Sequence, residues 1–165
     1  MKILSIDCSA KSVSAAIAED GKLIAEGFLN IKLTHSETLM PIIEQVLLNS
    51  RLSLKDIDGF AVTAGPGSFT GIRIGISALK GLAFAEQKPI YAFSTLEAMA
   101  LAFSGGAYAD GIVCGLMDAR RNQVYTGIYE FVGDELHIIE PQMAVGIEEI
   151  AAKLCAMNRE VIFLG

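Results

Sequence analysis

The pattern of apolar and polar positions along the first hundred residues predicts eight elements in the order βββαβαβα. Short apolar runs bounded by turn signals such as Asp20-Gly21 are typical of strands. Longer segments whose apolar side chains recur at helical spacing predict helices. The predicted strands are 2–6, 13–18, 23–28, 57–63 and 90–93, and the predicted helices are 35–49, 71–86 and 95–103.

The same pattern begins again after Ser104-Gly105-Gly106. An apolar run leads to Asp118, as an earlier one leads to Asp7, and a valine follows each aspartate six residues later, at Val124 and Val13. An isoleucine follows four residues after each valine. Because these offsets agree within otherwise different sequence, they indicate an internal repeat. The later copy predicts strands at 112–116, 136–139 and 161–164 and a helix at 147–157.

Two copies of a βββαβα unit are typical of the actin-like (ASKHA, ribonuclease-H-like) α/β fold. In that fold a mixed sheet carries helices on its faces, and the cleft between the copies usually holds a nucleotide. We therefore predict a first lobe over residues 1–106 and the start of a second lobe over 107–165, which is truncated after its fourth strand.

Composition narrows the functional classes. Of the 165 residues, 52% are hydrophobic and 19% charged, which favours burial of surface against another subunit. The chain shows no signal peptide and no run near the roughly 20 apolar residues of a membrane span, so we expect a cytoplasmic protein.

The net charge of −6 is opposite to that of most nucleic-acid-binding proteins, so direct tRNA binding by this chain alone is not expected. Cys8, Cys114 and Cys155 are too widely separated for a disulfide framework and read as reduced core residues.

The glycine-rich segment 65–75 lies between a predicted strand and a predicted helix. One interpretation is an anion site at the helix N-terminus. The other is structural, with glycines that make the turn, Thr70 as the helix cap and Gly75 allowing close packing. Arg73 opposes the helix dipole in the first turn and is expected to reach a carboxylate or phosphate on a partner.

Asp7 and Ser9 stand where actin-like kinases place the carboxylate and hydroxyl that hold a metal–phosphate group. The alternative is that both side chains satisfy backbone donors of a tight hairpin. Asp118 is followed by Ala-Arg-Arg, which is not a small-residue phosphate cradle. Since a nucleotide cleft needs both turns, we do not expect ATP hydrolysis.

Six segments, in this order along the chain, resemble the TsaB (YeaZ) family. They are IDCS at 6–9, HSETLMP at 35–41, GPGSFTGIRIG at 65–75, KGLA at 80–83, STLEA at 94–98 and DARRNQVY at 118–125. The resemblance implies a scaffold subunit that dimerises with its catalytic paralogue TsaD and works with the ATPase TsaE. Together these install threonylcarbamoyl on the adenosine beside the tRNA anticodon. Members of the family usually continue well past the position of Gly165.

The catalytic relatives implied by this resemblance carry an H-x-x-x-H metal motif six residues after a proline. Counted from Pro89, those positions are Thr95 and Met99 here, and neither side chain suits such a metal. The only histidines, His35 and His137, are far apart in sequence, and His35 reads as a helix-start residue. We therefore expect no catalytic residue, no metal and no tightly bound cofactor, with ATP or ADP held only in the assembled complex. The alternative is an actin-fold small-molecule kinase or other ATP-binding enzyme.

The helix over 71–86 is apolar nearly all round, which predicts a partner surface shared with the helix over 35–49. Two such ridges can pack as a four-helix contact, either with the paralogue TsaD or between two copies of this chain in isolation. The alternative for the isolated chain is a monomer. The other alternative is that the helix over 95–103 covers the ridge. The predicted interface residues are Leu39, Met40, Ile43, Leu47, Arg73, Ile76, Leu79, Leu82 and Ala83.

Overall fold

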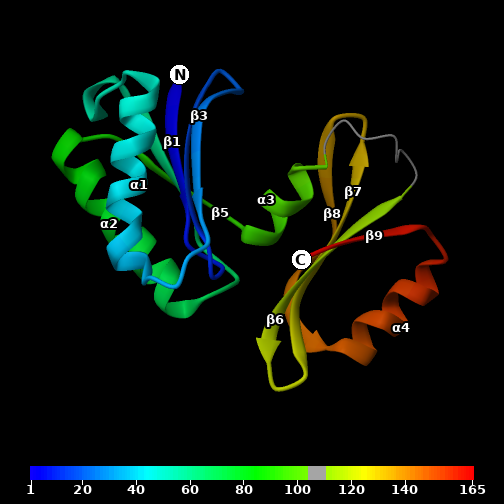
Figure 1. Cartoon of the computed structure of the whole chain (residues 1–165). Coiled ribbons are helices and arrows are strands. Elements are labelled where there is room, and N and C mark those ends of the chain that lie inside the picture. The colour runs from blue at the N-terminus through cyan, green and yellow to red at the C-terminus, as the bar shows by residue number, and fades with distance from the viewer. Residues whose placement is uncertain (104–110) are drawn as a thin grey trace. The chain divides into compact units, whose positions relative to one another are not determined.

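The computed structural model describes residues 1–103 and 111–165, so Ser104-Gly105-Gly106 lies outside the described residues. The chain forms two compact units, Met1–Phe93 and Ser94–Gly165 (Figure 1). This division falls before the predicted third helix rather than after it. The reason is that Leu96 and Ala100 of that helix are buried in a cluster with residues of the second unit.

The first unit is a five-stranded mixed sheet in the order β3-β2-β1-β4-β5. The first three strands are antiparallel, and β4 and β5 run parallel to β1. Two helices pack on the sheet, α1 mainly on β2 and β3 and α2 mainly on β4 (Figure 1). The elements are β1 (Lys2–Asp7), β2 (Val13–Glu19), β3 (Lys22–Leu29), α1 (His35–Ser50), the 3-10 turn η1 (Leu54–Asp56), β4 (Gly59–Thr63), α2 (Phe69–Glu86) and β5 (Ile90–Phe93).

Local chemistry fixes where these helices begin. Thr34 and Glu37 form a capping box at α1, where the Thr34 amide donates to Glu37 Oε2 at 2.9 Å. The cap of α2 is Ser68, whose Oγ accepts the Gly71 N–H at 3.2 Å. The predicted cap, Thr70, is therefore wrong and lies inside the first turn. The predicted helix starts two residues late for the same reason.

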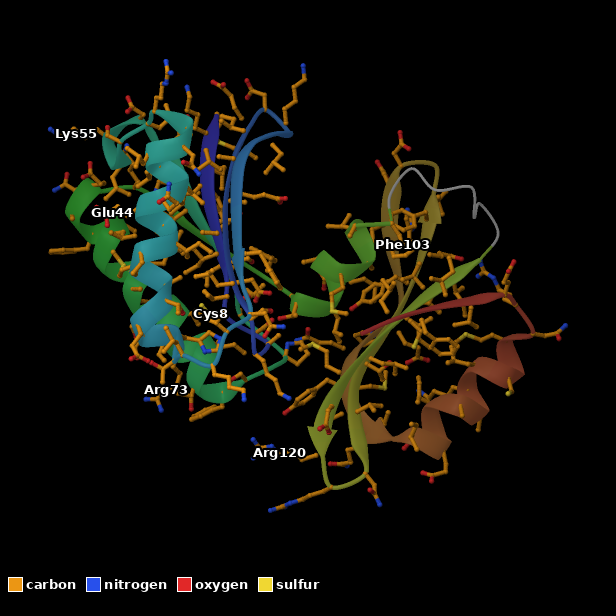
Figure 2. The ribbon with its side chains drawn as sticks, in the orientation of Figure 1. Cys8, Glu44, Lys55, Arg73, Phe103 and Arg120 are labelled. Atoms are coloured by element: carbon orange, nitrogen blue, oxygen red, sulfur yellow. The ribbon has the colours of Figure 1, made fainter. Side chains whose placement is uncertain are left out.

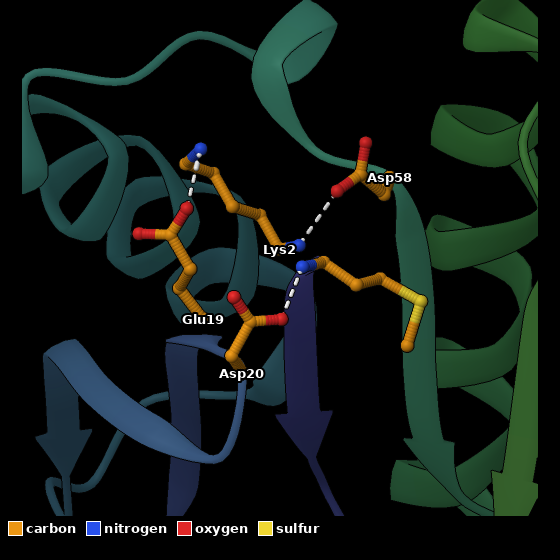
Figure 3. Close-up of polar contacts among 5 residues, drawn as sticks. Lys2, Glu19, Asp20 and Asp58 are labelled. Carbon is orange, nitrogen blue, oxygen red and sulfur yellow. Dashed lines mark hydrogen bonds and ion pairs between the residues drawn. The ribbon is translucent and has the colours of Figure 1, made fainter.

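The core of the first unit lies between the sheet and its two helices. Alternate side chains of β1 and β2, such as Leu4, Ile6 and Ile17, meet Leu39 of α1 and Leu79 of α2, and all are at most 2% exposed. Full burial of each such side chain contributes about 1.5–3 kcal/mol. At the N-terminal end of β1, solvent-accessible ion pairs join neighbouring strands, including Lys2 to Glu19 at 2.8 Å (Figure 3). Exposed pairs of this kind contribute at most about 1 kcal/mol.

The second unit repeats this arrangement with four strands in the order β8-β7-β6-β9. Its sheet is packed on both faces. Ile150 and Leu154 of α4 cover one face, and Leu96 and Ala100 of α3 cover the other. The elements are α3 (Thr95–Leu101), β6 (Ile112–Arg120), β7 (Gln123–Val132), β8 (Glu135–Gly146), α4 (Ile147–Met157) and β9 (Val161–Leu164).

The internal repeat predicted from the sequence is confirmed. In each unit the first strand pairs antiparallel with the second and parallel with the fourth. Asp7 Oδ1 accepts the Ser9 N–H at 2.8 Å, and Asp118 Oδ1 accepts the Arg120 N–H at 2.7 Å. In both units an aspartate near the end of the first strand therefore accepts the N–H two residues later, and the actin-like α/β fold class is confirmed.

Candidate functional site

The carboxylate at the end of β1 is held from two sides. Asp7 Oδ1 accepts the Ser9 N–H at 2.8 Å and the Thr63 hydroxyl at 2.6 Å. Thr63 is the last residue of β4, which lies beside β1, and it is buried. Sequence reasoning found Asp7 and Ser9 but missed Thr63. The available signal was a hydroxyl residue that ends an apolar strand directly before the glycine-rich segment.

The glycine-rich loop closes over this turn. The Ser68 N–H donates to the Ser9 carbonyl at 2.6 Å. Gly67 has φ +152°, and a Cβ there would clash with the Ser9 carbonyl oxygen, while one at Gly71 would clash with that of Cys8. Ser9 is 2% exposed, and within the described residues its Oγ has no hydrogen-bond partner. The loop thus packs against the backbone of Cys8 and Ser9 and buries Ser9, while Asp7 stays half-buried, which supports the structural interpretation of the glycines.

The Cys8 thiol, in the turn after β1, is not a nucleophile. Cys8 is 1% exposed, and burial together with the neighbouring Asp7 charge raises its pKa to about 12. A thiol with that pKa stays protonated near neutrality and is inert. Burial also raises the pKa of Cys114. Cys155 differs from the sequence-based expectation because it lies exposed on α4.

Arg73 finds a neighbour within its own helix. Its guanidinium carbon lies 5.1 Å from the centroid of the Phe69 ring, a cation–π distance. Figure 2 shows Arg73 at the lower end of α2, near the beginning of that helix. Since Phe69 is 74% exposed, the pair presents a charged and aromatic surface to solvent.

The nine predicted interface residues divide into three groups. Four of them, Leu39, Ile43, Leu79 and Ala83, are buried in the core of the first unit. They hold the fold together, so a surface contact rests on other residues. Three are half-buried and pack against that core, namely Leu47, Ile76 and Leu82. The remaining two, Met40 and Arg73, are exposed.

The helices leave a different apolar surface exposed, which we call the outer face. Its large side chains are Met40, Leu48, Phe69 and Phe84, which are between 46% and 87% exposed. Ser77, Gly81 and Ala85 are exposed on α2 at four-residue spacing. Sequence reasoning missed Leu48, Phe69 and Phe84. Phe69 precedes the predicted helix, which began at residue 71, and the predicted surface included Leu79 and Ala83, which are core.

A Cβ at Gly81 would meet nothing within 4 Å, so the fold of this chain does not require a glycine there. Glycine in a helix interior costs about 1 kcal/mol relative to alanine. Small residues four apart allow the backbone of another helix to approach closely. The outer face therefore combines exposed aromatic rings with a row of small residues, against which a helix of another chain can pack closely.

The positions of the catalytic metal motif lie on α3. Thr95 is buried in its first turn, and Met99 packs beside the second-unit cluster. Across residues 1–103 and 111–165, no three His, Cys, Asp or Glu side chains gather closely enough to hold a metal ion. His35 is confirmed as the first residue of α1, and its Nε2 lies 3.2 Å from the Ser12 carbonyl.

No helix in the described part of the chain is long and apolar enough to cross a membrane.

The family model "TsaD: tRNA N6-adenosine threonylcarbamoyltransferase" matches residues 29–159. The Bacillus subtilis tRNA threonylcarbamoyladenosine biosynthesis protein TsaB is 36% identical over the whole chain, which spans 71% of that relative. The chain belongs to the TsaB family. The Escherichia coli TsaB is 37% identical over 79% of the chain, which there spans 55% of the relative.

Solved structures agree with the TsaB assignment. YeaZ from Pseudomonas aeruginosa superposes with a TM-score of 0.79 and 31% identity, covering 89% of this chain and 68% of that one. A ROK hexokinase from Thermus thermophilus has a TM-score of 0.52 at 14% identity, covering 83% of this chain and 49% of that one. At that identity the hexokinase shows only the shared fold.

Proposed function

We propose that this TsaB-family chain is a non-catalytic subunit of the bacterial complex that makes threonylcarbamoyladenosine in tRNA. It dimerises with the catalytic paralogue TsaD and supports its transfer of threonylcarbamoyl to the adenosine beside the anticodon. The observation that carries the proposal is the similarity to a TsaB protein over all 165 residues. The residues at the metal-motif positions, Thr95 and Met99, add to it because neither is a ligand for a hard or borderline metal.

The complex is proposed to act in the cytoplasm, with the ATPase TsaE joining through the assembled pair. ATP or ADP would be held only in that assembly, since the chain's own glycine-rich loop packs against the turn at Cys8 and Ser9. The same packing of the loop against the turn gives no support to the alternative of a small-molecule kinase.

The outer face of α1 and α2 is the surface we propose for TsaD, and for a second copy when the chain is alone. Its exposed aromatic side chains, Phe69 and Phe84, can serve as anchors, since aromatic residues dominate binding energy at interfaces. The strip at Ser77, Gly81 and Ala85 would receive a helix of the partner. A stable contact of this kind buries more than about 1,000 Å² in total.

The test is a Gly81→Leu variant measured against purified TsaD. Because a side chain at Gly81 points into open space, the variant keeps the fold and its helix gains propensity, but the added bulk blocks a close helix. We expect at least a tenfold loss of TsaD affinity and a matching loss of tRNA modification. Ala152→Leu places the same leucine side chain at an exposed site of α4, adding one carbon less, and is the control. Native affinity in a folded Gly81→Leu variant would place the contact elsewhere.

A further inference from the structure

The hairpin that joins β6 to β7 carries two arginines at its tip. Arg120 pairs with Gln123, so Arg121 and Asn122 form a two-residue loop between them. The φ angles of Arg120, Arg121 and Asn122 are +66°, +52° and +59°. A loop with positive φ at both central residues is the turn that suits a twisted hairpin, and Asn-Gly is its preferred sequence.

The backbone conformation at this tip is one that arginine disfavours. Left-handed φ brings the Cβ of an L-residue close to the backbone, and only glycine, asparagine and aspartate adopt it readily. Asn122 meets this requirement and the two arginines do not. The anchor of the turn is Asp118, whose Oδ1 accepts the Arg120 N–H at 2.7 Å. The fold is therefore served by the aspartate and the asparagine, and nothing in its packing calls for two guanidinium groups.

Both guanidinium groups are also available to a ligand. Arg120 and Arg121 are exposed, and within residues 1–103 and 111–165 neither forms an ion pair. The chain as a whole carries −6, so this tip is a local concentration of positive charge on an acidic protein. The planar, permanently charged guanidinium group matches the two oxygens of a phosphodiester in bidentate geometry.

We propose that the Arg120–Asn122 tip contacts the phosphate backbone of the tRNA on which the complex acts. The contact positions the RNA and reads no sequence, as phosphate contacts do. It revises the expectation that tRNA meets this subunit only indirectly, because that expectation came from the net charge averaged over the chain. The inference rests on the proposed function, since it takes the tRNA from the activity of the complex.

The test measures tRNA affinity of the complex with TsaD across a range of KCl concentrations. Arg121→Asn removes one charge and places a residue that accepts the left-handed backbone. We expect tRNA affinity to fall roughly three- to tenfold and the slope of log K against log salt to drop by about 0.7–0.9, one phosphate contact. The control is Arg51→Asn, which removes the same charge from another exposed, left-handed position, with φ +57°.

Thermal unfolding and TsaD affinity without RNA complete the design. We expect Arg121→Asn to unfold at the same or a higher temperature and to bind TsaD normally. An unchanged salt slope in an assembled complex overturns the tip contact and leaves the proposed function standing. Weaker TsaD binding with unchanged tRNA binding also overturns it, because the tip then contacts protein. If the chain and TsaD do not associate at all, both proposals fail.

Discussion

Single residues decide whether the turn after β1 is open to a phosphate group or is packed by the glycine-rich loop. Asp7 is a plausible phosphate-site carboxylate from sequence, and only the structure shows that Thr63 and the Ser9 amide share its Oδ1. The pairing of Asp7 with Thr63 joins positions 56 residues apart, which no local pattern reveals. The clash of any Cβ at Gly67 with the Ser9 carbonyl is equally invisible in sequence. Asp7 itself and its turn were predictable because the repeat marks them twice.

The Thr63 hydroxyl gives the first prediction at this scale. Thr63→Val keeps the shape and β-branching of the side chain and removes its hydrogen bond to a carboxylate. Bonds to charged groups contribute about 1.5–3 kcal/mol, so we expect urea unfolding to show a loss in that range. Thr70→Val at an exposed position of α2 is the control, with an effect within about 0.5 kcal/mol. Equal effects of the two variants would mean that the Thr63 bond adds nothing.

The thiols give a prediction about reactivity and pH. Iodoacetamide at pH 8 should label exposed Cys155 quickly and reach Cys8 and Cys114 only after unfolding, as read by mass spectrometry. The folded pKa of Cys8, about 12, lies above the ordinary thiol pKa of 9.0. The folded chain therefore retains a proton that the unfolded chain loses, so the free energy of unfolding falls as the pH rises from 9.0 to about 12. In Cys8→Ser we expect a shallower fall over this window, and an identical slope would contradict the assignment.

Elements were predicted well from the sequence where their signals are local. The helix over 147–157 and the strands over 90–93 and 161–164 match the structure to the residue. The strand predicted over 136–139 from the internal repeat extends over Glu135–Gly146 and includes Pro141. Proline is tolerated there since β8 lies at the sheet edge and its pairing with β7 is irregular around that residue.

The two glycines of α2 allow a matched prediction at the scale of the helix. Gly71→Ala places a Cβ against the Cys8 carbonyl, a backbone atom, so the first turn of α2 must move away from the sheet. We expect a loss of at least about 2 kcal/mol in denaturant unfolding. Gly81→Ala has open space and should gain about 0.5–1 kcal/mol from helix propensity. Similar effects of the two substitutions would show that α2 is not held by the glycine contact.

At the scale of the whole molecule, the sequence predicted two copies of one unit but placed their division later than the structure does. Helix α3 is short, and the sequence alone does not say against which of the two sheets its apolar side chains pack. Leu96 and Ala100 enter the second-unit cluster with Val113 and Tyr129, which assigns α3 to that unit. Two of the five interface residues predicted on α2, Leu79 and Ala83, lie in the core for a related reason, because periodicity identifies an apolar face without telling whether the core or a partner covers it.

The last prediction follows from each unit having its own core. Leu79 is fully buried in the first-unit core, and Ile150 is 2% exposed in the second. Truncating a buried leucine or isoleucine to alanine costs about 2–5 kcal/mol. Leu79→Ala should therefore lower hydrogen-exchange protection in peptides from β1 and β4 while those from β6 and β7 keep theirs, and Ile150→Ala should do the reverse. Because local opening reports cooperative units, loss of protection across both units in either variant would show that they unfold as one.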